Sequence, residues 1–223
     1  MIDLHTHSIF SDGVLIPAEL ARRAEHKGYE VIGMTDHGDI SNIDFIIPRL
    51  VAIAAELNPV LNVKIVPGIE ITHVPPSLIA DTIAKARDLG AKIIVVHGET
   101  IVEPVAPGTN RAAIDAGADI LAHPGLISEE DVRAAKDRNV LLEITARKGH
   151  SLTNGHVARL AEKIGAKMII NTDSHAPGDL IDDASATQVI CGTGLSENFF
   201  AKMQENASAL IQSVLLEPSL LSV

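Results

Sequence analysis

Short apolar runs alternate along the chain with longer segments in which apolar residues recur every three or four positions. The short runs predict strands, and the longer segments predict amphipathic helices. Strands that alternate with helices are typical of a parallel sheet with right-handed crossovers, either open and doubly wound or closed into a barrel. The predicted strands are Met1–Leu4, Val31–Thr35, Lys64–Glu70, Ile93–Val96, Ile120–Ala122, Leu141–Ile144 and Met168–Asn171. The predicted helices are Pro17–Lys27, Asn42–Leu57, Ser77–Leu89, Asn110–Ala116, Ser128–Arg138 and Gly155–Ile164.

A glycine recurs where predicted helices end. Gly28, Gly90, Gly117 and Gly165 each follow a helical segment, and one or two residues separate each of them from the next strand. Glycine can adopt the left-handed conformation that ends a helix. The same helix–glycine–strand unit therefore occurs four times, which favours a repeated β/α architecture.

The domain organisation is simple in sequence terms. No linker or low-complexity stretch interrupts the pattern before about residue 205. We therefore expect residues 1–223 to form a single domain, with Glu217–Val223 as a docked or frayed end. Neither the glycine-rich dinucleotide fingerprint nor a P-loop is present, so the sequence does not support a nucleotide-binding version of this architecture.

The charge balance is acidic. Lys and Arg total 18 against 29 Asp and Glu, a formal net charge of −11, and aromatic residues make up only 2% of the chain. An acidic surface repels nucleic-acid backbones unless a local patch reverses the field, and few aromatic faces are available to stack on bases. Nucleic acid is therefore a possible but not a favoured partner.

Other features bear on compartment and membrane association. No apolar run approaches the 18 or so residues that a membrane span needs, and Met1–His5 lacks the basic and apolar regions of a secretory signal. The single cysteine, Cys191, excludes an internal disulfide framework. These features predict a cytoplasmic protein without membrane association.

Polar residues follow the predicted strands at their carboxyl ends. In a parallel barrel these ends open on one rim, which is where active sites lie. His5 and His7 are two residues apart and so point to one side of an extended strand, and Asp173 and His175 repeat this spacing. Nine residues are thereby expected on one concave face: His5, His7, Asp12, His37, Glu70, His97, His123, Asp173 and His175.

These residue types predict a metal centre. Neutral imidazole and carboxylate are the ligands of zinc, manganese and iron, whereas no thiolate cluster is present. Nine such ligands are too many for one cation and match two or three, with Glu70 as a possible bridge. Isolated histidines at strand ends are usually structural, and we expect His26, His73, His150 and His156 to lie mostly outside the site. Glu99 and Asp36 are expected to orient ligands or to act as caps.

The motifs that carry these residues resemble the PHP (polymerase and histidinol phosphatase) family. They cover residues 2 to about 205 in the family's order, and they are specific as a set. The motifs are Asp3-Leu4-His5-Thr6-His7-Ser8 with Ser11-Asp12-Gly13, Thr35-Asp36-His37, Pro67-Gly68-Ile69-Glu70, Val96-His97, Ala122-His123-Pro124 and Asn171-Thr172-Asp173-Ser174-His175.

The resemblance implies a distorted seven-stranded β/α (TIM-like) barrel and a trinuclear metal centre. By motif position, His5, His7, Glu70 and Asp173 would hold one metal, and Glu70 would bridge to a second held by His97 and His123. Asp12, His37 and His175 would hold the third. Some relatives have histidine in the place of Asp12, so the carboxylate here could change selectivity at that position.

The expected activity is metal-dependent hydrolysis of a small phosphomonoester by a metal-activated hydroxide, as in histidinol phosphatases. Arg147, just past the sixth strand, is the candidate cation for the phosphate, because guanidinium pairs with phosphate bidentately. Lys148 and Arg111 are weaker candidates. Asp12, His37 and His175 are the side chains expected to assist catalysis, for example by protonating the leaving alcohol.

Three other functions are compatible with parts of the pattern. The first is a phosphodiesterase or exonuclease of the same family, acting on nucleotides or short oligonucleotides. The second is C–N hydrolysis by an amidohydrolase barrel, although binuclear members commonly use a lysine on strand four, where this chain has Val95-Val96-His97. The third is a non-catalytic partner subunit like the related barrel protein of ribonuclease P. The sequence leaves open the metal, the organic part of the substrate and the oligomeric state.

Overall fold

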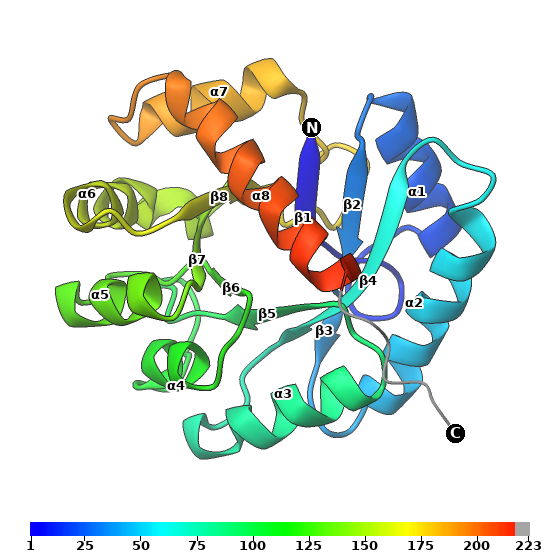
Figure 1. Cartoon of the computed structure of the whole chain (residues 1–223), viewed down its shortest axis with the longest axis horizontal. Coiled ribbons are helices and arrows are strands. Elements are labelled where there is room, and N and C mark those ends of the chain that lie inside the picture. The colour runs from blue at the N-terminus through cyan, green and yellow to red at the C-terminus, as the bar shows by residue number, and fades with distance from the viewer. Residues whose placement is uncertain (217–223) are drawn as a thin grey trace.

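Seven parallel strands form a nearly closed barrel with helices around its outside (Figure 1). The computed structural model describes residues 1–216, and the expectation for Glu217–Val223 lies outside them. The sheet order β1-β2-β4-β5-β6-β7-β8 follows the chain, as right-handed β/α units require. These strands are β1 (Ile2–Thr6), β2 (Val31–Met34), β4 (Lys64–Ile71), β5 (Ile93–His97), β6 (Ile120–Ala122), β7 (Leu141–Thr145) and β8 (Met168–Asn171).

The barrel closes between its first and last strands. Thr6 and Ser174 form a single parallel bridge, and the His7 N–H donates to the Ser174 carbonyl at 2.8 Å. The Leu4 N–H is satisfied by the Asn171 side chain rather than by a ladder partner. The predicted seven-stranded β/α barrel is therefore confirmed. Its pairing is irregular at this seam and also between β1 and β2, where the register shifts between Asp3 and Thr6.

One short strand was not predicted. The two-residue strand β3 (His37–Gly38) pairs with β4, where His37 lies opposite Glu70. Two residues are too few for a hydrophobic pattern to be recognised. Their pairing fixes His37 at the rim beside the carboxylate.

The outer helices match the predicted segments closely. The prediction Ser77–Leu89 corresponds to a short 3₁₀ turn, η1 (Pro76–Leu78), that leads into α3. Left-handed backbone at Gly28, Gly90, Gly117 and Gly165, with φ of 83°, 102°, 76° and 76°, confirms the four predicted helix ends. The helices are α1 (Pro17–His26), α2 (Ile43–Leu57), α3 (Ile79–Asp88), α4 (Thr109–Asp115), α5 (Glu129–Asp137) and α6 (Asn154–Ile164).

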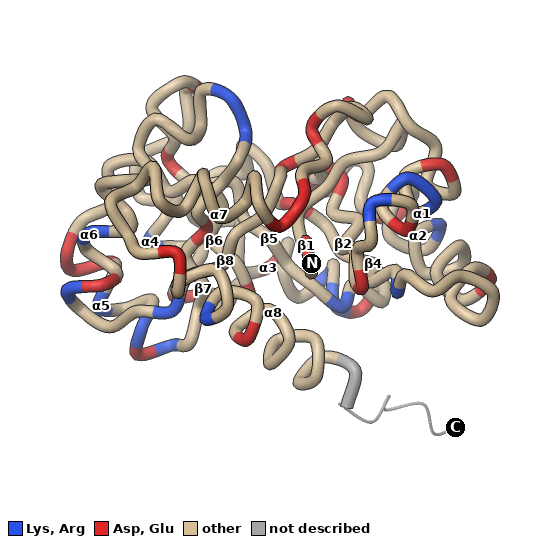
Figure 2. Tube along the Cα trace, turned by 90° about the horizontal axis from the view of Figure 1, so that it is seen from above, with Lys and Arg blue, Asp and Glu red and all other residues tan. Residues whose placement is uncertain are grey.

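Two further helices, α7 (Asp183–Gly192) and α8 (Asn198–Leu216), follow the last strand and were not predicted. The side chain of Gln204 in α8 bonds to both the N–H and the carbonyl of Ile2, and Asn206 donates to the Met168 carbonyl. Because Ile2 and Met168 begin β1 and β8, α8 covers the amino ends of these strands. In Figure 2, α8 lies below the strands.

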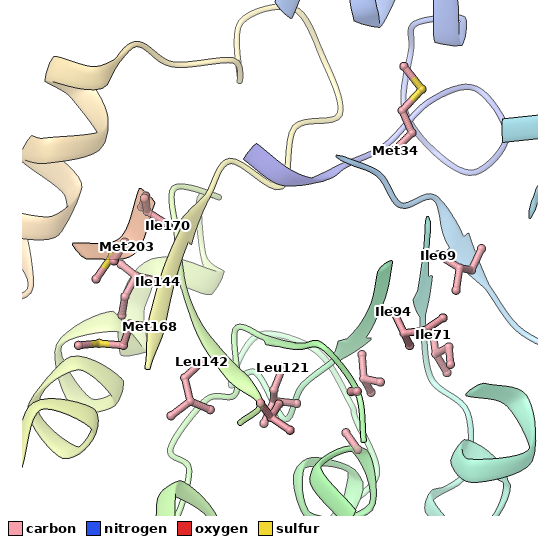
Figure 3. Close-up of a cluster of buried hydrophobic side chains, with 14 of the residues drawn as sticks. Met34, Ile69, Ile71, Ile94, Leu121, Leu142, Ile144, Met168, Ile170 and Met203 are labelled. Atoms are coloured by element: carbon pink, nitrogen blue, oxygen red, sulfur yellow. The ribbon is translucent and has the colours of Figure 1, made fainter. Parts of the chain in front are cut away.

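Two apolar layers hold the barrel together. Outward-facing side chains such as Ile94, Leu121 and Leu142 pack beneath the helices (Figure 3). A second cluster fills the barrel interior, and Ala207 and Ile211 of α8 join it. Its remaining buried members are Ile2, Leu4, Val66, Ile93, Val95, Ile120, Ala122, Leu141 and Ile169.

None of the helices within residues 1–216 combines the length and apolar character needed to cross a membrane.

Candidate metal centre

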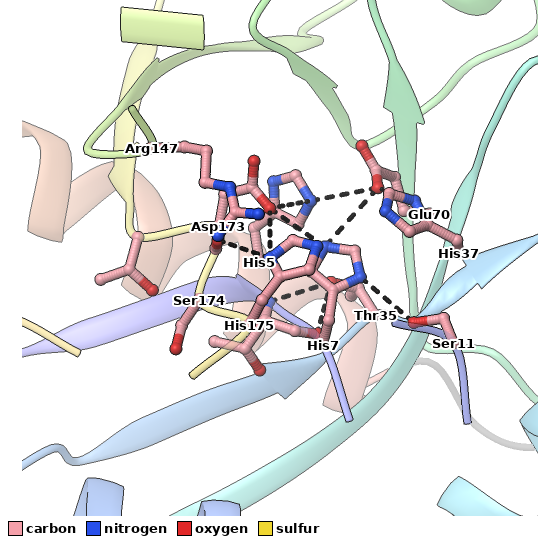
Figure 4. A network of polar contacts seen from close by, with 12 residues as sticks. His5, His7, Ser11, Thr35, His37, Glu70, Arg147, Asp173, Ser174 and His175 are labelled. Atoms are coloured by element: carbon pink, nitrogen blue, oxygen red, sulfur yellow. Dashed lines mark hydrogen bonds and ion pairs between the residues drawn. The ribbon is translucent and has the colours of Figure 1, made fainter. Parts of the chain in front are cut away.

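All nine side chains expected on the rim lie in one cluster at the carboxyl ends of the strands. Figure 4 labels His5, His7, His37, Glu70, Asp173 and His175 among them. They come from far apart in the chain. His5 is on β1 and Glu70 is on β4, whereas Asp173 follows β8. Most are buried: His5, Glu70 and Asp173 are each no more than 2% exposed. Because parallel strands place their carboxyl ends side by side, residues that are far apart in the sequence become neighbours at the rim.

The four side chains implied for a first metal surround one small space. The Nε2 atom of His5 is 3.3 Å from Glu70 Oε2 and 3.8 Å from Asp173 Oδ1. The Nε2 atom of His7 is 3.6 Å and 3.1 Å from the same two oxygens. A tetrahedral zinc site with bonds of about 2.0–2.1 Å has ligand atoms about 3.3–3.4 Å apart. These spacings suit a shared cation.

Glu70 also reaches the neighbouring histidines with its other oxygen. Its Oε1 is 3.5 Å from His123 Nε2, which is 3.7 Å from Asp173 Oδ2. The His97 ring lies edge-on to His123, with centroids 4.4 Å apart. The carboxylate is thus placed to bridge the two halves of the cluster, and His97 with His123 would hold a cation on its far side.

The third implied set lies nearest to solvent. Asp12 Oδ1 is 3.1 Å from His175 Nε2 and 3.5 Å from His37 Nε2. The His7 ring stacks on that of His175, so the set adjoins the first. Because Asp12 is exposed while the histidines are largely buried, this position is open to exchange with solvent.

Six buried side-chain atoms in the cluster have no hydrogen-bond partner. An unsatisfied buried polar atom costs about 1–3 kcal/mol, so native proteins rarely concentrate them. Metal coordination would satisfy the nitrogen and oxygen lone pairs together. The residues present therefore fit a multinuclear divalent-cation centre. The atoms are His5 Nε2, His7 Nε2, Glu70 Oε1, Glu70 Oε2, His123 Nδ1 and Asp173 Oδ1.

Charged groups in the cluster shift one another's pKa values strongly. Burial opposes protonation of His5, but Glu143, Glu70 and Asp173 outweigh it and raise the pKa of His5 well above its usual value. Burial likewise opposes ionisation of Glu70, but His5 and His37 hold its pKa well below the usual value. The carboxylate is therefore charged and ready to bind cations.

Other histidines are held neutral. Burial lowers the pKa of His97 to about 3 and that of His150 to about 4, and it lowers the pKa of His7 well below the usual value. Neutral imidazole is the form that coordinates metals, so these rings need lose no proton to do so.

Supporting carboxylates orient the ligands. Glu143 Oε1 accepts from His5 Nδ1 at 2.8 Å and from Asn171 Nδ2, and Glu143 Oε2 accepts from the His123 N–H. With its proton on Nδ1, His5 presents the Nε2 lone pair to the centre. Sequence reasoning did not assign a role to Glu143, which lies within β7, because one carboxylate gives no spacing signal.

Asp36 holds the loop that carries Asp12. Its Oδ1 accepts from the Ser8 and Ser11 N–H groups and from the Ser11 hydroxyl, and its Oδ2 accepts from the Ser8 hydroxyl. The structure thus places Asp36 behind the ligands, in an orienting position. Glu99 is a cap, because its Oε1 accepts from the backbone N–H groups of Gly108 and Asn110.

Backbone strain coincides with two of the expected ligands. His123 and Asp173 have φ of 28° and 51°, in the left-handed region that residues with a Cβ seldom adopt. Such conformations cost about 1–3 kcal/mol and persist where the surrounding structure imposes them. Here each positions a ligand directly after a strand.

Arg147 lines a cavity of about 480 Å³ together with Lys148, Thr172 and Asp179. Its Nη1 is 3.3 Å from Asp179 Oδ2, which also accepts from the His175 N–H. Figure 4 draws Arg147 with the cluster residues. Arg111, the weaker candidate, instead pairs with Asp115 and Glu130 on the outer helices.

The remaining histidines divide into two groups. His150 stacks on His123 with ring centroids 4.2 Å apart, and His73 lies 5.2 Å from His97, so both adjoin the cluster against expectation. His156 bonds to the Ile127 carbonyl, away from it. Sequence reasoning also missed Glu103, which contacts His73, His97 and His150; its loop carries no motif that could have signalled it.

Comparison with known sequences bears on this cluster. The PHP domain family matches residues 3–99, a range that runs from Asp3 to just past His97. An uncharacterized protein of Methanocaldococcus jannaschii is 49% identical over 196 residues, which cover 87% of this chain and 90% of that protein. A probable phosphatase of Clostridium novyi is 29% identical over 207 residues, which cover 78% of this chain and 79% of that protein.

Solved structures share the fold. A protein in the cryo-EM structure of archaeal ribonuclease P with mature tRNA superposes with a TM-score of 0.74 at 17% identity, covering 97% of this chain and 94% of that one. Histidinol phosphate phosphatase of Lactococcus lactis, complexed with zinc, L-histidinol and phosphate, superposes with a TM-score of 0.60 at 18% identity, covering 96% and 93%. At such identities the likeness shows the barrel alone.

Proposed function

Since the chain belongs to the PHP family, we propose that it is a metal-dependent phosphoesterase whose substrate is a small phosphomonoester, as for histidinol phosphatases. The observation that carries this proposal is the group of six buried, unpartnered ligand atoms on His5, His7, Glu70, His123 and Asp173. The similarity to probable phosphatases supports the reaction class. Zinc in the histidinol phosphate phosphatase structure supports zinc over manganese or iron.

Two or three divalent cations would be held by the nine rim residues, in the three sets described above. When bound, they would lower the pKa of a coordinated water to about 7 and screen the negative charge of the phosphate. Glu70, with one oxygen facing each half of the cluster, would be the shared ligand.

The chain's own side chains would bind the phosphate and move protons. Asp179 holds the Arg147 guanidinium in the wall of the adjoining cavity, from which it can donate to phosphate oxygens. The His175 Nδ1–H donates to the Asp173 carbonyl at 2.9 Å, so its Nε2 faces Asp12. Asp12, His37 and His175, on the open side of the cluster, are the residues proposed to assist protonation of the leaving alcohol.

A phosphodiesterase or nuclease of the same family is the closest alternative. Basic positions are dispersed among acidic ones over the described chain (Figure 2), and the net charge of −11 opposes binding of a long nucleic acid. A mononucleotide or short oligonucleotide would suffer less from this repulsion. The amidohydrolase alternative is weakened because β5, the fourth strand of the barrel, contains no lysine that could bridge two metals. In this chain the proposed bridge is the Glu70 carboxylate.

A non-catalytic partner subunit is the alternative from another class. The similarity in fold to a protein of archaeal ribonuclease P favours it. The cluster of unpartnered ligand atoms argues for metal chemistry instead, because a protein used only for binding would have no need of them.

We also propose that residues 1–223 form one domain. The two ends of the described chain are tied together, since Gln204 of α8 bonds to the backbone of Ile2 on β1.

The test is a metal-stripped sample, reconstituted separately with zinc, manganese and iron, and assayed against a panel of phosphate monoesters and diesters. Turnover of monoesters only after reconstitution is expected. Preferential turnover of diesters would favour the nuclease-like alternative. Less than one equivalent of tightly bound cation without any hydrolysis would reject the enzyme and favour a binding role.

A further inference from the structure

Glu103 brings a carboxylate from the loop between β5 and α4 against three imidazoles. Its Oε2 is 3.2 Å from His97 Nε2 and 3.2 Å from His73 Nε2, and its Oε1 is 3.5 Å from His150 Nε2. Of these four residues, only His97 belongs to the nine expected ligands. The contacts therefore need an explanation beyond the family's motifs.

The hydrogen bonding of His97 restricts that explanation. Its Nδ1 is 3.2 Å from the Gly98 carbonyl oxygen, which can only accept, so Nδ1 carries the hydrogen. In the neutral ring, Nε2 then presents a lone pair to the Glu103 carboxylate. Two hydrogen-bond acceptors facing each other at this distance repel unless a cation lies between them.

The spacing is that of ligands around one cation. Atoms bound to a tetrahedral zinc at about 2.0–2.1 Å are about 3.3–3.4 Å apart, and the Glu103–His97 and Glu103–His73 separations are both 3.2 Å. Because His97 has only one free ring nitrogen, Glu103 would share the cation already assigned to His97. No separate cation is required.

Hydrogen bonds on both sides of Glu103 hold its loop in place over the cluster. Glu99 caps the backbone N–H groups of Gly108 and Asn110, which lie beyond Glu103 in the chain. Before it, the Thr100 hydroxyl is 2.8 Å from His150 Nδ1. Glu103 is thus held from both sides over the cluster.

We propose that Glu103 is a further metal ligand, which the β5–α4 loop supplies to the outer side of the divalent cation held by His97 and His123, with His73 and His150 beside it. This inference rests on the proposed metal centre. It adds an anionic ligand to that cation on the side of this loop.

The experiment compares the wild-type chain with Glu103→Gln, each stripped and titrated with zinc and with cobalt(II). In Glu103→Gln we expect the dissociation constant of one cation to rise about ten-fold or more. The cobalt absorption bands should also shift, because an anionic oxygen ligand is lost. Glu103→Asp should recover part of the affinity.

The matched control is Glu99→Gln, in which the amide oxygen still accepts the two capping hydrogen bonds. It should keep wild-type affinity and cobalt absorption. Unchanged dissociation constants and bands in Glu103→Gln would overturn the inference while the metal centre stands. Equal shifts in Glu99→Gln would also overturn it, because loop position would then explain them. Failure of the wild-type chain to bind cations would overturn the proposed function itself.

Discussion

The two ends of the barrel differ in what they bury. The amino end buries apolar side chains, and the carboxyl end buries polar ligand atoms. At the amino ends of the strands, α8 inserts Ala207 and Ile211 among interior apolar side chains, and Gln204 satisfies the backbone of Ile2. At the carboxyl ends, buried ligand atoms such as His5 Nε2 and Glu70 Oε1 have no hydrogen-bond partners, and Glu70 Oε2 has only ion-pair contacts with imidazoles, the shortest being 2.7 Å to His37 Nδ1. The polar groups at the amino end have partners within the protein, whereas the rim carries ligand atoms that cations would satisfy.

Stability and chemistry therefore depend on different ends of the barrel. Burial of apolar surface stabilises by about 25 cal/mol per Å², and this contribution needs no ligand. Each buried polar atom at the rim that lacks a hydrogen-bond partner instead costs about 1–3 kcal/mol, which coordination to a cation would offset. Changes at the α8 end should therefore affect unfolding, and changes at the rim should affect metal binding and turnover.

The largest effect is expected from Glu70→Gln, which should impair the metal centre at the rim and leave the rest of the fold unchanged. The neutral amide cannot bridge the two halves of the cluster, so hydrolysis of a phosphomonoester should fall on the order of 10³-fold. Metal analysis should show loss of cation. Far-UV circular dichroism should stay unchanged, because the α8 end is untouched. Near wild-type turnover with full metal content would contradict the bridging role.

Ala207→Asp should disrupt the apolar packing at the amino end of the barrel. Ala207 is fully buried in the barrel interior, and an uncompensated buried carboxylate should lower the free energy of unfolding by about 3 kcal/mol or more. The midpoint of thermal unfolding should fall by roughly 6–12 °C, measured by calorimetry. The control Ala209→Asp, on the exposed face of α8, should unfold like wild type.

Below its transition, Ala207→Asp should retain wild-type kcat/KM and metal content. A selective loss of turnover in the folded variant would show that the two ends are coupled, and the comparison would fail.

Glu143→Gln tests the support of a ligand rather than a ligand itself, because Glu143 is buried at the rim but is not an expected ligand. Removing the charge that orients His5 should weaken cation binding about 10–100-fold. Titration of stripped protein measures this. Glu162→Gln, an exposed change on α6, is the control. Equal affinities in all three proteins would mean that Glu143 is purely structural.

The smallest effect is expected from Arg147→Gln. Loss of one partly exposed guanidinium should lower kcat/KM about ten-fold, or about 1.4 kcal/mol, with unchanged cation affinity. Arg159→Gln, exposed on α6, serves as the comparison in the same assay. If both variants hydrolyse substrate like wild type, Arg147 does not contact the phosphate.

The elements that the sequence revealed are those with a strong local signal. The strand Ile93–Val96 and the glycine ends at Gly28 and Gly165 were recognisable because apolar runs and left-handed turns depend on neighbouring residues. Helices α7 and α8 were not predicted, because they follow the last strand and so lie outside the repeating helix–glycine–strand pattern. The strand β3 is set by its pairing with β4 rather than by its own two residues.

The local pattern of the chain was enough to predict the β/α order and the residue types available at the rim, because these follow from periodicity and motif spacing. Periodicity left an open sheet and a barrel both possible, and the resemblance to the PHP family implied the barrel. Only the folded structure shows which further side chains adjoin the nine that were expected at the rim. It placed Glu103 and His150 beside His97 and His123, made Glu143 the support of His5, and seated α8 in the amino end of the barrel. Such contacts join residues far apart in the chain, and no local pattern encodes the direction in which a loop folds back.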